Sequence, residues 1–205
     1  MISVAARSGA DAAFNFKLRV AIDQAKAARM PKENIERAIA RGAGSGEGNN
    51  LEELIYEGFG PEKISVIIEV ITDNKNRSVM QIKKILSDHG GSLGSKNSVM
   101  WQFDHKGVLK IEATALTEEQ ELALIEAGAE DFQNQDEQTI IYSAITDFDN
   151  VKKKIAELNL PLTEANLEFV PKERVAVQDE DRLAKFFESL DDNDDVNNFY
   201  TNADF

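Results

Sequence analysis

The sequence predicts an α+β protein in which a small N-terminal helical domain precedes two α+β domains, one inserted in the other. Three observations support this class. Apolar residues recur at helical spacing in the first 41 residues, a glycine-rich segment follows, and strand and helix patterns alternate after it. Such alternation is typical of a sheet with helices on one face. With 205 residues, 42% of them apolar, the chain is long enough for more than one core.

The first predicted domain, residues 1–41, is a basic helical hairpin. Pro31 is placed to start its second helix and Gly42 to stop it. The apolar stripe predicted for the first helix consists of Phe14, Leu18, Ala21, Ile22, Ala25 and Ala28. The inner face predicted for the second helix consists of Ile35, Ala38 and Ile39.

Residues 42–50 are predicted to form a flexible hinge. They contain four glycines, but neither the G-x-G-x-x-G nor the Walker pattern of a phosphate-binding loop. No predicted strand precedes them and no predicted helix begins at their end. A glycine- and serine-rich linker is therefore the better interpretation.

The second predicted domain comprises residues 51–106 together with 172–205. Its strands are predicted at 54–56, 64–72, 99–103 and 196–201, the third from the alternation of Val99, Trp101 and Phe103. Its helices are centred on 79–86 and 183–190, and Gly90-Gly91 ends the first of them.

Residues 107–171 are predicted to form the inserted α+β domain. Thr117 and Gln120 have the spacing of a capping box, and Gly128 is placed to end the helix that it starts. Strands are predicted at 108–111, 139–142 and 167–169, with a second helix at 148–158.

The composition argues against catalysis. The chain has no cysteine, which excludes disulfides and thiolate chemistry, and neither His89 nor His105 has the partner spacing of a zinc site. No hydrolase or kinase motif is present. We therefore expect no enzymatic activity, metal site or small-molecule substrate. The acidic run Asp191, Asp192, Asp194 and Asp195 lacks the spacing of a calcium loop and is predicted to be a solvated turn.

The sequence also predicts a cytoplasmic protein with no membrane partner. No apolar run approaches the ~18 residues of a membrane span, and the N-terminus lacks a signal-peptide pattern.

The charges divide sharply along the chain. Residues 1–41 hold eight Lys or Arg and four Asp or Glu, a net charge of +4, whereas the rest hold fifteen and thirty-three, a net charge of −18. A basic unit on an acidic body indicates that a polyanion, such as DNA or rRNA, is bound at one end.

Two sets of residues are candidates for binding nucleic acid. Arg37 and Arg41 in the hairpin stand at i, i+4, an unfavourable pair unless an anion lies between them. Glu33 offsets part of this repulsion, so a merely solvated face is an equally good interpretation. The hairpin candidates are Lys17, Arg19, Lys26, Arg29, Lys32, Arg37 and Arg41.

The second candidate set lies where a predicted strand meets a helix. A helix N-terminus flanked by cations is a natural phosphate cradle, although a plain loop is at least as good an interpretation. These candidates are Asn74, Lys75, Asn76 and Arg77.

At these same residues the chain resembles the YebC family, the bacterial "probable transcriptional regulatory protein" group with a mitochondrial translational-activator branch. The matching segments are KLRVAI at 17–22, AKAARMPKENIERAI at 25–39, YEGFGP at 56–61, TDNKNR at 72–77, HGGSLG at 89–94 and DVNNFYTN at 195–202.

The resemblance implies the three-domain architecture, no catalysis and no cofactor. It implies a DNA-binding transcriptional regulator, or alternatively a ribosome-associated factor that relieves stalling at proline-rich stretches. The residues themselves favour contact with phosphates and show no helix-turn-helix pattern for base reading, so RNA is the better physical fit. A protein-interaction module without a nucleic-acid role remains a third alternative.

The N-terminus departs from the family pattern. Family members usually begin with a lysine- and histidine-rich segment of the Gly-His-Ser-Lys-Trp type, whereas this chain begins at Met1-Ile2-Ser3-Val4. The resemblance therefore implies either a misassigned start or a truncated relative. In both cases the basic hairpin is expected to be incomplete.

Overall fold

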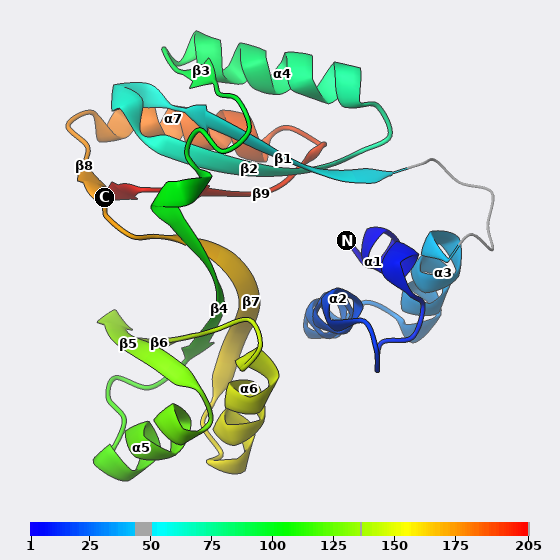
Figure 1. Ribbon diagram of the computed structural model, residues 1–205, viewed down its shortest axis with the longest axis vertical. Helices are drawn as coiled ribbons and strands as arrows, with labels where there is room; N and C mark the ends of the chain where they lie inside the picture. Colours follow the sequence, from blue (N-terminus) through cyan, green and yellow to red (C-terminus); the bar gives the residue numbers. More distant parts are fainter. Residues whose placement is uncertain (44–50, 136, 205) are drawn as a thin grey trace. The chain divides into compact units, whose positions relative to one another are not determined.

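The computed structural model describes residues 1–43, 51–135 and 137–204. It confirms the α+β class, with an N-terminal helical domain and two α+β domains, one inserted in the other (Figure 1). The inserted unit is Phe103–Lys172, and the chain on either side of it belongs to the other compact unit. The hinge predicted at 42–50 lies almost wholly outside the described residues.

The N-terminal domain contains three helices: α1 (Ile2–Ala5), α2 (Phe16–Ala27) and α3 (Lys32–Gly42). A 3-10 turn, Ala6–Ser8, follows α1. The sequence analysis predicted neither α1 nor this turn. Gly42 lets α3 pass close to α1, because a Cβ at that position would lie 2.1 Å from the carbonyl oxygen of Ser3. The core of this domain consists of Ile2, Ala6, Leu18, Ala21, Ala25 and Ile35.

The prediction that Phe14 belongs to this core is wrong. Helix α2 begins at Phe16, because the Asn15 side chain caps it by accepting a hydrogen bond from the N–H of Leu18 at 3.1 Å. Phe14 therefore lies in the preceding loop, with 91% of its surface exposed. Ala28, at the other end of the predicted stripe, is the exposed C-cap.

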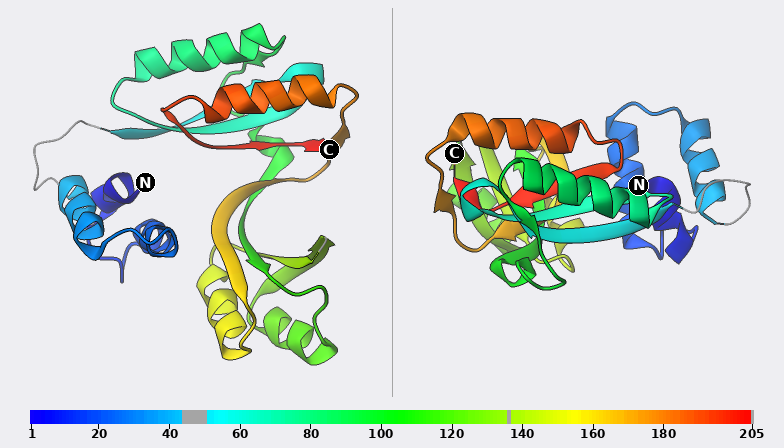
Figure 2. Two further views of the ribbon diagram at one scale, coloured as in Figure 1. Left: turned by 180° about the vertical axis from the view of Figure 1, so that it is seen from behind. Right: turned by 90° about the horizontal axis from the view of Figure 1, so that it is seen from above.

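The first α+β domain has one sheet of four antiparallel strands in the order β3-β1-β2-β9. Helices α4 (Lys75–Asp88) and α7 (Glu180–Asp191) lie side by side over one face of it (Figures 1 and 2). Ile68, Ile82, Leu86, Phe186 and Leu190 are fully buried in this layer. The strands are β1 (Glu52–Phe59), β2 (Ser65–Thr72), β3 (Ser92–Leu93) and β9 (Val196–Thr201); β8 (Val175–Ala176) and β10 (Ala203–Asp204) form a short parallel pair.

The strand predicted at 99–103 is also wrong. Residues Met100–Gln102 form a 3-10 turn, and strand β4 begins only at Phe103. The buried carboxylate of Glu57 accepts hydrogen bonds from the N–H groups of Asn97, Val99 and Met100, at 2.6, 2.9 and 2.8 Å. Three converging donors bend the backbone into a turn, so Val99 is buried by the turn and not by strand pairing.

The inserted domain has an antiparallel sheet in the order β5-β6-β4-β7. Both elements of the capping box at Thr117 are present, and Gly128 follows the helix with φ +107°, so these two predictions are confirmed. Gly107 on β4 faces Phe148, whose Cδ2 would lie 2.4 Å from an added Cβ. The elements are β4 (Phe103–Ile111), α5 (Glu118–Glu126), β5 (Ala129–Gln135), β6 (Gln138–Ser143), α6 (Phe148–Glu157) and β7 (Leu162–Pro171).

Candidate nucleic-acid interface

The four cations predicted on and next to α2 have different surroundings. Arg19 donates from Nη1 to the carbonyl oxygen of Ala12 at 2.9 Å and lies 5.5 Å from the ring centroid of Phe16. Its guanidinium therefore supports the loop before α2. Lys26 is 4.0 Å from Asp23 and Lys17 is 3.5 Å from Glu53, both exposed pairs of small energetic value.

Three of the predicted arginines carry the least compensated charge among the candidates. Arg29, Arg37 and Arg41 are exposed and form no ion pair with any described residue. Arg29 occupies the turn between α2 and α3 with φ +58°, and the other two lie one turn apart on α3. Lys32, at the start of α3, is 3.6 Å from Glu36. The candidates in this domain thus include three guanidinium groups without an ion pair to a described residue and three ammonium groups in weak, exposed pairs.

The loop before α4 is built differently. Asn74 caps α4 by accepting a hydrogen bond from the N–H of Arg77 at 3.1 Å. Lys75 forms an ion pair with Glu52 on β1, and Asn76 is exposed. The cations of this loop are therefore already neutralised within the first α+β domain, which weakens the phosphate-cradle interpretation.

Arg77 is the centre of an internal network. Its Nη2 donates to both carboxylate oxygens of Asp195, at 2.9 and 3.1 Å, and to Asp73 at 3.0 Å. Ser78 Oγ donates to the same Asp195 carboxylate at 2.6 Å, and Thr72 Oγ1 at 3.3 Å. The network joins the start of α4 to the residue that precedes β9.

Asp195 therefore corrects the prediction of a solvated acidic turn, since only 9% of its surface is exposed. Burial alone raises the pKa of Asp195. The hydrogen bonds from Ser78, Arg77 and Thr72, together with the charge of Arg77, outweigh burial and hold the pKa below its ordinary value. Sequence reasoning missed this role because Asp195 is 118 residues from Arg77.

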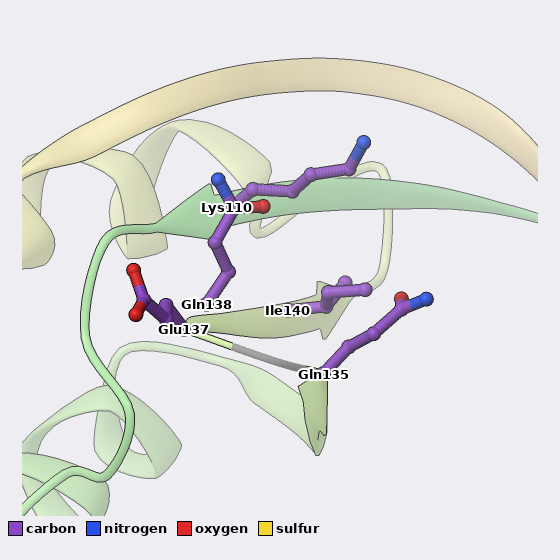
Figure 3. Close-up of a pocket in the computed structure, with 5 residues that line it drawn as sticks. All are labelled: Lys110, Gln135, Glu137, Gln138 and Ile140. Carbon is purple, nitrogen blue, oxygen red and sulfur yellow. The ribbon is translucent and has the colours of Figure 1, made fainter.

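One hollow of about 810 Å³ lies in the inserted domain (Figure 3). Lys110, one of its lining residues, forms an ion pair with Glu164 at 2.8 Å. Within the described parts of the chain, no three His, Asp or Glu side chains gather where they could hold a metal ion. The hollow is lined by Lys110, Gln135, Glu137, Gln138 and Ile140.

The helices have no membrane-spanning character. Across the described ranges, none combines the length and the apolar content needed to traverse a bilayer.

Comparison with known proteins agrees with this architecture. Residues 1–45 match the domain family described as "TACO1/YebC protein N-terminal domain", and residues 51–203 match "TACO1/YebC second and third domain". A crystal structure of a conserved hypothetical protein from Aquifex aeolicus, 39% identical, superimposes with a TM-score of 0.85 and covers 99% of this chain and 86% of that chain.

Similar proteins from many bacteria carry the name "probable transcriptional regulatory protein", and two of them illustrate the likeness. The one from Thermoanaerobacter pseudethanolicus is 42% identical, covering 100% of this chain and 85% of the relative. The one from Desulforamulus reducens is 42% identical, covering 98% and 86%. The fold and these matches define the class as a protein with an N-terminal helical domain and two α+β domains, one inserted in the other. The chain belongs to the TACO1/YebC family.

Proposed function

We propose that this protein regulates gene expression, without catalysing a reaction, by binding nucleic-acid phosphates through its N-terminal helical domain. The observation that carries the proposal is the exposure of Arg29, Arg37 and Arg41 without an ion pair to any described residue. A guanidinium fork matches the geometry of a phosphate and keeps its charge at every physiological pH. Because these arginines have no internal carboxylate partner in the described chain, a phosphate does not have to displace one.

The charge distribution restricts where a polyanion binds. The N-terminal 41 residues have a net charge of +4 and the remainder −18, so the rest of the chain repels nucleic acid. Lys17, Lys26 and Lys32 add positive charge to the same domain. The loop before α4 contributes less to nucleic-acid binding in this proposal, because Lys75 and Arg77 are paired with carboxylates. This second candidate set is Asn74, Lys75, Asn76 and Arg77.

DNA-bound transcriptional regulation is the first form of this function, and the names of the relatives support it. Contact with the DNA backbone is the better-supported mode of binding. Glu33 and Glu36 stand on α3 among its arginines, and carboxylates there oppose close approach to the acceptor-rich edge of a G·C base pair.

A translation factor that binds rRNA on the ribosome, relieves stalling at proline-rich stretches and acts in the cytoplasm is the second candidate. One observation favours it. The exposed ring of Phe14 lies in the same basic domain, and folded RNA offers unpaired bases to aromatic side chains, whereas duplex DNA does not.

The proposal predicts that changing Arg29, Arg37 and Arg41 together to alanine lowers nucleic-acid affinity at least tenfold near 0.1 M salt. The slope of log affinity against log salt should shrink by about 2.7 for duplex DNA and about 2.1 for single strands, since each lost phosphate contact removes about 0.9 or 0.7. Fluorescence anisotropy with a labelled duplex DNA and a labelled single-stranded RNA measures the affinity and the salt slope for each.

The matched control changes Lys83, Lys84 and Lys185 to alanine. These three exposed lysines lie on α4 and α7, so the net charge changes equally while the N-terminal domain stays intact. Equal losses in the two triple variants would contradict a local interface. A single Lys75→Ala variant should keep its nucleic-acid affinity within about twofold of wild type.

Sucrose-gradient sedimentation of cell lysate distinguishes the two candidate functions. A translation factor should co-migrate with ribosomes, and the variant that lacks the three arginines should not.

A further inference from the structure

Phe14 is the most exposed large apolar side chain among the described residues, at 91%. Its ring lies in the loop between the 3-10 turn Ala6–Ser8 and helix α2, within the basic domain. Burying a phenylalanine side chain is normally favourable, so its exposure leaves that free energy available to a partner.

The loop that carries Phe14 is held by hydrogen bonds from the backbone of Phe14 and Asn15 and from the Asn15 side chain. Asn15 Nδ2 donates to the carbonyl oxygens of Ala5 and Gly9, both at 2.7 Å. The N–H of Phe14 and the N–H of Asn15 both donate to the carbonyl oxygen of Asp11, at 3.1 and 3.0 Å. The backbone at Phe14 is thus fixed before any partner arrives, which reduces the entropy lost on binding.

Cationic side chains accompany this loop. The Arg19 guanidinium holds this loop by donating a hydrogen bond to the carbonyl oxygen of Ala12, and it also packs on the ring of Phe16. Lys17, three residues after Phe14 in the chain, is exposed and lies 3.5 Å from Glu53, an exposed ion pair of small energetic value. An exposed aromatic ring within a few residues of cationic side chains is a combination found where proteins hold a single strand: the ring stacks on a base and a cation contacts an adjacent phosphate.

We propose that Phe14 is a stacking platform for an unpaired base of a single-stranded nucleic acid, an inference that rests on the proposed nucleic-acid function of this domain. One ring accommodates one base. The residues beside it, Ala13 and Asn15, do not extend it into an apolar surface, whereas a protein partner requires a contiguous patch. A fully paired duplex presents no free base face, so the site selects single strands or unpaired loops.

The test measures binding of the full chain to a labelled ten-nucleotide uridine-rich strand and to a duplex DNA of equal length. Phe14→Ala should lower affinity for the single strand roughly tenfold and leave duplex affinity within about twofold. Phe14→Leu keeps apolar volume but lacks a π face, so its affinity for the single strand should fall nearly as far. Phe14→Trp should keep the wild-type affinity. Strands of RNA and DNA with the same sequence show which sugar the site accepts.

A direct signal comes from tryptophan fluorescence. Trp101 is the only tryptophan in the chain, so Phe14→Trp in a Trp101→Phe background reports on position 14 alone. Stacking should quench its emission on adding the single strand, but not on adding inorganic polyphosphate, which has charge and no bases. Quenching by both polyanions, full binding by Phe14→Leu, or equal losses on single strand and duplex would each overturn the proposal. If the wild-type protein binds nucleic acid but shows none of these effects at position 14, the stacking proposal is wrong and the phosphate-binding proposal is unaffected. If the wild-type protein binds neither the single strand nor the duplex, the phosphate-binding proposal is also wrong.

Discussion

Changing Asp195 to alanine is expected to lower the free energy of unfolding of the first α+β domain by about 3 kcal/mol. The carboxylate accepts hydrogen bonds from Ser78, Thr72 and Arg77. Ser78 and Thr72 are 0% and 1% exposed, so their hydroxyl groups lose a partner that water cannot easily replace. The Arg77 side chain is 46% exposed and can turn to solvent, which limits the loss. Urea denaturation followed by circular dichroism measures the change.

Asp192→Ala and Asp194→Ala are the matched controls, because both aspartates are exposed in the same acidic run. Each should change the free energy of unfolding by no more than about 0.5 kcal/mol. Similar losses in all three variants would mean that the acidic run acts through its overall charge and not through the Asp195 network.

The same network gives stability a defined pH dependence. The pKa of Asp195 is lower in the folded protein than in the unfolded chain, where it is about 3.9. Its contribution is therefore complete above the unfolded pKa and is lost as the pH falls through the folded pKa. The stability difference between wild type and Asp195→Asn should be constant from pH 7 to about pH 5 and should narrow below about pH 4. A difference that narrows toward alkaline pH would contradict the assigned direction.

Changing Glu57 to alanine is expected to have the second large effect, lowering the free energy of unfolding by about 3 kcal/mol. The carboxylate is 5% exposed and accepts three backbone N–H groups of residues 97–100, each of which would lose its acceptor at roughly 1 kcal/mol. Burial raises the pKa of Glu57, but these three donors and the charge of Lys96 bring it below its ordinary value, so the group binds as a carboxylate.

Glu57→Gln should recover only part of this loss. Its amide keeps one acceptor oxygen but places an NH₂ group against backbone donors that need an acceptor. Glu53→Ala, at an exposed position on the same strand, should change stability by less than about 0.5 kcal/mol. Full stability in Glu57→Gln would show that shape, and not acceptor chemistry, holds the turn.

Local signals in the sequence predicted much of the fold. The Thr117 capping box, the Gly128 stop and the final strand 196–201 depend on neighbouring residues, and all three match the structure. The turn at Met100 was missed because its cause, Glu57, is about forty residues away. Strand β5 was missed because most of its residues are polar and exposed, which gives no apolar alternation to recognise.

The candidate site shows the same division. Charge counting found the cations, but it could not say which of them already had a partner. Lys75 and Arg77 resembled the hairpin arginines in sequence, yet the fold places Glu52 and Asp195 beside them. Phe14 matched a helical period, and only the Asn15 cap places it outside α2.

The inserted domain has one further consequence, for protein engineering. Phe103 and Pro171 are directly paired partners at the ends of β4 and β7, and such partners have Cα atoms about 5 Å apart. The chain thus leaves the first α+β domain and returns to it at neighbouring positions, which a short glycine linker is expected to bridge. We therefore expect that residues 103–172 can be removed or exchanged as one cassette, which would allow the two compact units to be studied separately.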